Sequence, residues 1–249
     1  MYADAIINIV NNFILFSIVV AINYKIKCRY WIKFDKKGTS LFSIGVVLAV
    51  ILFSLIGLWI CIDKTYYLKI NLSNIVNSTL LLILFGFGYL GVAFFEEALF
   101  RGFILCKLLK TLPIPIAIII QAIIFTSLHL FNYKNEENLW IKMLTAFIIA
   151  IIFAITTIRT KSLMIAIGAH FALDLCSKLV VSADKNRFNW LIHFEQNKIT
   201  SSYGHIIIGT DYKILIILTI TLFLVIVFVE NPLKLQEKKL LEGKSPVHR

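Results

Sequence analysis

The chain has 249 residues, of which 59% are hydrophobic and only 16% are charged, and its mean hydropathy is +0.86. This composition excludes an ordinary soluble domain and predicts an integral membrane protein. The formal net charge of +11 would also suit nucleic-acid binding, but the basic residues fall in loops between apolar runs and not along one polar face. We therefore expect contact with the lipid bilayer and no nucleic-acid partner.

About seven apolar stretches are long enough to cross the hydrocarbon core of a bilayer. In chain order they cover residues 5–24, 41–62, 79–105, 114–131, 139–158, 162–180 and 212–229. The sequence therefore predicts an all-α fold, a polytopic transmembrane helical bundle of about seven spans. We expect one integral membrane domain over residues 1–249, with a motif-bearing core at about 79–180.

Loop charge predicts the orientation. If the N-terminus lies outside, most basic residues fall in inner loops at 25–37, 107–110 and 159–161 and in the charged tail at 231–249. The basic loop at 181–211 is an exception, but long loops weigh less in this rule. We expect the N-terminus outside and the C-terminus in the cytoplasm. The abundance of Ile, Lys and Asn, typical of AT-rich bacterial genomes, suggests a multi-pass protein of a bacterial plasma membrane.

Two adjacent glutamates and an arginine interrupt the third stretch, which carries no other charge. Each such side chain deep in a bilayer costs roughly 2.5–3.5 kcal/mol, so we expect the cluster to face a protein-lined cavity. Glu97 and Arg101 are four residues apart and can form an ion pair on one side of a helix. Glu96 projects about 100° away and is expected to face the cavity. The alternative is an interfacial charge cluster at a helix end.

Two further polar elements lie on other apolar stretches. His129 follows Phe125 by one helical turn, and taken alone it fits a packing histidine equally well. His170 and Asp174 are four apart and share one stripe of the sixth stretch, where the carboxylate can orient the ring or both can hold a water or a metal ion. A helix–helix hydrogen bond is the alternative. The small Gly168 nearby suits a close helix approach.

Counted along their spans, these residues do not lie at the same depth in the bilayer. At 1.5 Å per residue, His129 lies about 24 Å into its span from Pro113, whereas Glu96 and His170 lie about 12–16 Å from the inner boundary. The residues can meet only if the fourth helix begins nearer Lys107 or the third helix is tilted.

Taken together, the three elements resemble a known pattern. Glu96-Glu97-x-x-x-Arg101, Phe125-x-x-x-His129 and His170-x-x-x-Asp174 stand in the order of the EExxxR, FxxxH and HxxxN/D motifs of the CPBP superfamily of intramembrane proteases. That superfamily includes CAAX prenyl endopeptidases and bacterial bacteriocin-processing or immunity (Abi) proteins. The resemblance covers about residues 91–177. Asparagine would be typical of the prenyl endopeptidases at position 174, so Asp174 favours the bacterial branch.

The resemblance implies peptide-bond hydrolysis of a peptide or membrane-anchored protein. By carry-over, Glu96 deprotonates a water, and His129 with His170 and Asp174 stabilises the oxyanion or holds that water. The remaining pair, Glu97 and Arg101, completes the motif. Both a metal-dependent and a metal-free version stay open. Zinc held by Glu96, His129 and His170 would be chemically complete, although no HExxH helix is present.

Two other functions remain open at this stage. A proton- or ion-coupled carrier would use Glu96, His129 and Asp174 as a relay, although the sequence shows no inverted repeat. A non-catalytic bacteriocin-immunity protein would keep the same residues but act by binding. The sequence does not define the oligomeric state.

Overall fold

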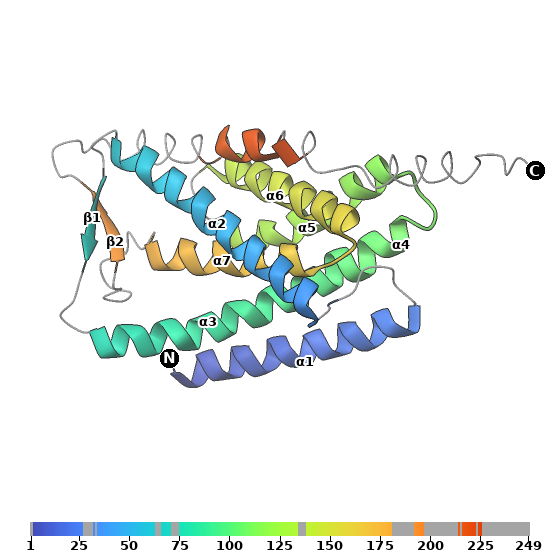
Figure 1. Ribbon diagram of the computed structural model, residues 1–249, viewed down its shortest axis with the longest axis horizontal. Coiled ribbons are helices and arrows are strands. Elements are labelled where there is room, and N and C mark those ends of the chain that lie inside the picture. Colours follow the sequence, from blue (N-terminus) through green and yellow to red (C-terminus); the bar gives the residue numbers. More distant parts are fainter. Residues whose placement is uncertain are drawn as a thin grey trace, which may run out of the picture.

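The computed structural model describes residues 2–26, 32, 34–62, 66–70, 75–133, 138–180, 192–196, 214, 216–222 and 224–225. The described elements are helices and one two-stranded sheet (Figure 1). In chain order they are α1 (Tyr2–Ile26), α2 (Lys36–Ile62), β1 (Tyr66–Ile70), α3 (Ile75–Glu97), the π-helix η1 (Ala98–Leu105), α4 (Cys106–Leu108), α5 (Ile114–Tyr133), α6 (Leu139–Thr160), α7 (Met164–Val180) and β2 (Ile192–Gln196).

The helical prediction is confirmed in its main lines. Each of the first six apolar stretches coincides with a helix, and the described part of the seventh is helical as well. Among the described residues, three helices are long and apolar enough to cross a membrane, over Lys36–Trp59, Leu82–Leu108 and Leu139–Thr160. Shorter apolar helices cover Ile9–Ile22, Ile114–Leu130 and Met164–Ser177. The full number of spans and their orientation stay predictions, and the tail at 231–249 lies outside the described residues.

The purely α-helical expectation needs one correction. Strands β1 and β2 pair antiparallel, with Tyr66 opposite Gln196 and Ile70 opposite Ile192. Each strand has only five residues and lies in a segment that we read as a connection between spans. Short β-compatible segments far apart in the chain leave no periodic signal, because only their pairing makes them strands.

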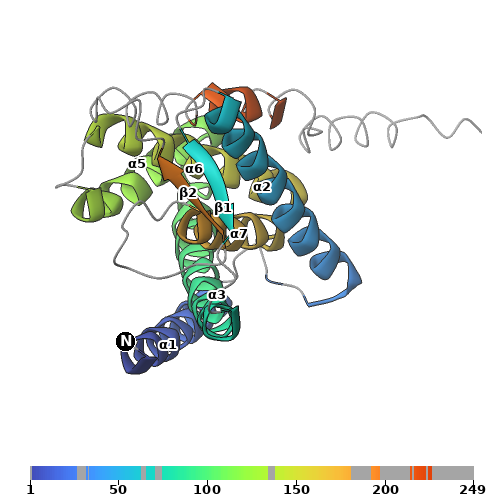
Figure 2. The ribbon, with the colours of Figure 1, turned by 90° about the vertical axis from the view of Figure 1, so that its left-hand side faces the viewer.

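Helix α7 is the centre of the bundle. It packs along α2 and also contacts α3 and α6, while α1 lies along α3 and α5 along α6. Figure 2 shows α1 and α3 together on one side and α2 on the other, with α7 between them. The outward faces are rich in exposed large apolar side chains, as in Ile14, Leu48 and Ile123. Such faces suit a lipid environment better than water.

Capping and backbone signals set the ends of several helices. Asp35 precedes α2, and its Oδ1 accepts the Gly38 N–H at 2.7 Å, as an N-cap side chain does. The Pro113 carbonyl accepts the Ala117 N–H at 3.0 Å and so starts α5. Lys161, with φ at 55°, ends α6 in the left-handed conformation. Since α5 begins at Ile114, an earlier start does not explain how His129 reaches the other motif residues.

The third helix changes its winding at the charged motif. It is α-helical to Glu97, π-helical over Ala98–Leu105 and α-helical again at Cys106. A π-helix bonds i to i+5 and is rare, occurring mostly at functional sites. The continuous helix Leu82–Leu108 is the longest of the described apolar helices that qualify as spans. Its tilt in the bilayer, the other solution expected for the depth mismatch, stays a prediction.

Two glycines let α2 and α7 approach at backbone distance. A Cβ at Gly168 would lie 2.2 Å from the Phe42 carbonyl oxygen, and one at Gly45 would lie 2.2 Å from the Ile165 carbonyl oxygen. Both distances are far below van der Waals contact, and both obstacles are backbone atoms that cannot move alone. The expected role of Gly168 in a close helix approach is thus confirmed, and Gly45 is its counterpart on α2.

Alanine at either contact should therefore separate the two helices. We expect Gly45→Ala and Gly168→Ala to lower the unfolding temperature and the yield of folded protein in detergent, because overpacking costs about 1–3 kcal/mol or more. Gly86→Ala is the matched control, since a Cβ there meets nothing within 4 Å. Equal stability of all three variants would contradict this account of the α2–α7 contact.

Candidate active site

Glu97 is the buried centre of the polar cluster. Its side chain is fully buried, and its Oε1 accepts hydrogen bonds from Arg101 Nη1 at 2.9 Å and from His170 Nδ1 at 2.8 Å. The ion pair expected between Glu97 and Arg101 is therefore present. The bond to His170 was not expected, because nothing in the sequence links two residues that are 73 positions apart. It ties the third helix to α7.

Arg101 is enclosed by groups that sequence reasoning missed. Its Nη2 donates to the Ala150 carbonyl on α6 at 3.3 Å, and its guanidinium lies 4.7 Å from the ring centroid of Phe125 and 5.3 Å from that of Phe153. Cation–π contacts of this kind stabilise a desolvated arginine. The position of Phe125 in the FxxxH motif was the available signal for one ring, whereas Phe153 carried none.

Glu96 occupies the open side of the cluster. Its side chain is 22% exposed, whereas that of Glu97 is wholly buried. Its Oε2 lies 3.8 Å from His170 Nε2 and has no hydrogen-bond partner among the described residues. The division expected from the sequence, with Glu97 held by Arg101 and Glu96 directed elsewhere, agrees with these contacts.

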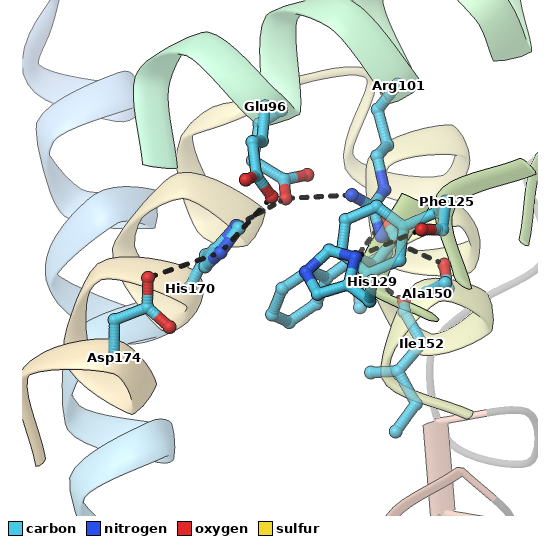
Figure 3. A network of polar contacts seen from close by, with 11 residues as sticks. Glu96, Arg101, Phe125, His129, Ala150, Ile152, His170 and Asp174 are labelled. Atoms are coloured by element: carbon cyan, nitrogen blue, oxygen red, sulfur yellow. Dashed lines mark hydrogen bonds and ion pairs between the residues drawn. The ribbon is translucent and has the colours of Figure 1, made fainter. Parts of the chain in front are cut away.

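His170 lies among three carboxylates. Glu97 binds Nδ1, while Asp174 Oδ2 approaches Nε2 at 3.5 Å from one turn along α7. The expected proximity of His170 and Asp174 is confirmed, but Glu97 makes the shorter contact and so does more to fix the ring. Because a carboxylate only accepts, Nδ1 carries a proton, and Nε2 faces Glu96 and Asp174. Figure 3 shows the ring between these acidic groups.

His129 lies on the other side of the glutamates from His170 (Figure 3). Its Nδ1 donates to the Phe125 carbonyl at 3.0 Å, which leaves Nε2 as the acceptor of the neutral ring. The imidazole also packs on the Phe125 ring, with 4.4 Å between the two ring centroids, and Phe125 in turn contacts the Arg101 guanidinium. The structure thus brings together all six residues singled out in the sequence, although His129 is the most peripheral of them.

The donor set gives a metal site no clear support. Among the described residues, no three or more His, Cys, Asp or Glu side chains form a group that could hold a metal ion. His170 already uses Nδ1 for Glu97, and only its Nε2 faces Glu96. The zinc site at Glu96, His129 and His170 stays a prediction, and we assign no step to a metal.

Comparison with known families agrees with this arrangement. Residues 77–176 match the sequence model of the family described as type II CAAX prenyl endopeptidase Rce1-like, and all six candidate residues lie within this range. The match confirms the resemblance to the CPBP and CAAX protease superfamily for this part of the chain. It supports an integral membrane protein with protease activity in general and a peptide or protein substrate. No curated protein and no solved structure matches the chain.

Removing Arg101 should leave Glu97 as a buried charge with its main partner lost. We expect Arg101→Met to lower the free energy of unfolding by about 3–5 kcal/mol. Adding Glu97→Gln should restore part of this loss, because the uncompensated carboxylate is then gone. Lys37→Met, at an exposed cation of α2, is the control and should change stability by less than about 0.5 kcal/mol. Chemical unfolding in detergent micelles measures the three variants and the unaltered protein. A loss of stability in the double variant as large as in Arg101→Met alone would contradict the pairing.

Proposed function

We propose that the protein is an intramembrane endopeptidase in which Glu96 is the general base. The observation that carries this proposal is the contrast between the two glutamates. Glu97 is buried and bonded to Arg101 and His170, whereas the Glu96 side chain is partly exposed and its buried Oε2, 3.8 Å from His170 Nε2, accepts no hydrogen bond from the described residues. A base needs an oxygen whose lone pair is not already occupied by a protein donor, within reach of its proton source, here a water.

The reaction then has a balanced course. Glu96 takes a proton from water while the water oxygen bonds to the scissile carbonyl carbon, and an oxyanion develops on the carbonyl oxygen. The C–N bond breaks as Glu96 returns the proton to the leaving nitrogen, so that a carboxylic acid, which keeps the second hydrogen of the water, and an amine result. Because each Nδ1–H is bonded to a protein acceptor, His129 and His170 are candidates for stabilising the oxyanion only when Nε2 is protonated as well. Asp174 holds the His170 ring on the side of Nε2.

The exposure of the side chains supports one direction of substrate approach. Asp174 is 34% exposed and Glu96 is 22% exposed, whereas Arg101 and Glu97 are completely buried. A peptide therefore reaches the cluster from the side of Asp174 and Glu96, and the Glu97–Arg101 pair supports it from behind. The substrate is a peptide or membrane-anchored protein. Asp174 in place of asparagine favours substrates other than prenylated ones.

Replacing Glu96 should abolish cleavage without unfolding the protein. We expect Glu96→Gln to reduce kcat roughly 10²–10⁴-fold, the usual contribution of a general base. The assay uses purified protein in nanodiscs with a peptide panel, including prenylated and unprenylated CAAX peptides, and detects the fragments by mass spectrometry. Asp35→Asn makes the same exchange at an exposed helix cap, where asparagine also caps, and should keep full activity.

Two results would contradict the proposal. Cleavage by the Glu96→Gln variant at the original rate would show that Glu96 is not the general base. Failure of the unaltered protein to cut any peptide, together with flux driven by a pH gradient, would favour the carrier instead.

Chelation tests the metal-free version of this chemistry. Because the described ligand-type side chains form no group for a metal, we expect hydrolysis to persist at an unchanged rate after exhaustive treatment with a strong chelator. Metal analysis of the same preparation by mass spectrometry gives the control. Activity that falls on chelation and returns on adding Zn²⁺ would restore the zinc site as the better account.

A further inference from the structure

Two fully buried polar side chains outside the proposed active site have no hydrogen-bond partner among the described residues. Gln121 on α5 and Thr157 on α6 are both 0% exposed. Neither the amide oxygen nor the amide nitrogen of Gln121 has a hydrogen-bond partner among the described residues, and the same holds for the Thr157 hydroxyl. The Nε of Arg101 is likewise buried and has no hydrogen-bond partner among the described residues. Buried groups of this kind are nearly always satisfied, and where protein atoms do not do so, ordered water does.

Helix periodicity places the two side chains in one layer. Gln121 stands one turn before Phe125 on α5, and Thr157 stands one turn after Phe153 on α6. The rings of Phe125 and Phe153 are the two that contact the Arg101 guanidinium. Because α5 and α6 run antiparallel, one turn back on α5 and one turn forward on α6 lead to the same side of the guanidinium.

The packing clusters agree with this placement. Phe125 and Ala150 pack together in one cluster, while Ala117 and Ala154 pack with Leu105 of η1 in the next. Gln121 lies between Ala117 and Phe125 in the sequence, so its level falls between these two clusters. The three helices η1, α5 and α6 surround that level. Gln121 therefore lies at the level next to Arg101, on the side away from Phe125, and Thr157, one turn after Ala154, borders the second of these clusters.

We propose that Gln121, Thr157 and Arg101 Nε together hold a small group of buried water molecules between η1, α5 and α6. An amide supplies both a donor and an acceptor, a hydroxyl supplies both, and Nε–H is a donor. This set suits neutral water, which needs two to four polar partners, and brings no acidic ligand for a cation. The bound water completes the hydrogen bonding of Arg101 and so helps to hold Glu97 against His170. Gln121 and Thr157 are thus positioning residues, a role that rests on the proposed function, whereas the water site itself does not.

Thermal unfolding distinguishes this site from a set of unsatisfied groups. If water is bound, Gln121→Leu and Thr157→Val each remove hydrogen bonds and should lower the unfolding temperature by roughly 2–4 °C. If no water is bound, the same exchanges remove unsatisfied polar groups and should raise that temperature. The two effects should also be coupled: the double variant should lose clearly less than the sum of the single variants, because both side chains serve the same water.

The neighbouring threonine provides a matched control. Thr156 Oγ1 donates to the Ile152 carbonyl at 2.9 Å, within its own helix, so Thr156→Val should add independently to Gln121→Leu. Thr157→Ser keeps the hydroxyl and loses only a buried methyl group, so its effect on the unfolding temperature should add independently to that of Gln121→Leu. The water site would be contradicted if the effects of Gln121→Leu and Thr157→Val were strictly additive. It would also be contradicted if either variant had a higher unfolding temperature. A high-resolution experimental structure with no water within hydrogen-bond distance of Gln121 would contradict it as well.

The positioning role has a separate kinetic readout. Gln121→Leu should lower kcat roughly tenfold with an unchanged KM, since supporting groups behind a site typically contribute this much, and Thr156→Val should change neither. If the thermal coupling is observed but kcat is unchanged, the water site stands and the positioning role is wrong. If the unaltered protein cleaves no peptide, the proposed protease function is contradicted. The water site is not, because the thermal experiment does not depend on activity.

Discussion

The carboxylate of Glu97 holds the site together. It lies at the junction of the third helix and α7, where one oxygen accepts from both Arg101 and His170. Because the carboxylate is fully buried, neither bond competes with water, and the loss of either partner would leave a charge in a medium of low dielectric constant. The positions of Arg101, of the two rings that enclose it and of His170 all follow from this one group.

Burial divides the cluster into a supporting side and a reacting side. Glu97 and Arg101 face protein on every side, whereas Glu96 and Asp174 keep part of their surface accessible. Adjacent glutamates can serve such different purposes because neighbouring residues of a helix project about 100° apart. The two imidazoles stand on either side of the acidic pair, and each has its Nδ1 engaged by an acceptor. On His170, Nε2 faces the carboxylates of Glu96 and Asp174.

Much of this arrangement was predictable from local sequence. Apolar length located the helices, since a bilayer span requires about 20 apolar residues, and i, i+4 spacing predicted the contacts of Glu97 with Arg101 and of His170 with Asp174. Each of these is a property of one helix. Three other contacts join different helices: the bond between Glu97 and His170, the contact of Phe153 with Arg101, and the close approach at Gly45. The spacing of these residues in the sequence does not predict such contacts. The β1–β2 pair escaped prediction for the same reason.

The winding of the third helix belongs with these long-range features. Residues 98–105 read as ordinary helix in the sequence, yet they form a π-helix immediately after the two glutamates. Arg101 lies within this segment and reaches the Ala150 carbonyl on α6. The preference of local sequence for an α-helix is therefore overruled by the contacts of a buried charge with two other helices. Such conflicts between local and tertiary preference are expected at functional sites.

The distance between the Glu97 carboxylate and His170 Nδ1 tests the account most directly. Solid-state NMR on protein in lipid bilayers, with ¹³C-labelled glutamate and ¹⁵N-labelled histidine, measures this contact without reference to activity. The account predicts a strong dipolar coupling at a protonated Nδ1, as a nitrogen–oxygen distance of 2.8 Å requires. A His170 ring without coupling to any glutamate carboxylate would mean that the third helix and α7 are not joined in this way, and would contradict the assembly of the site.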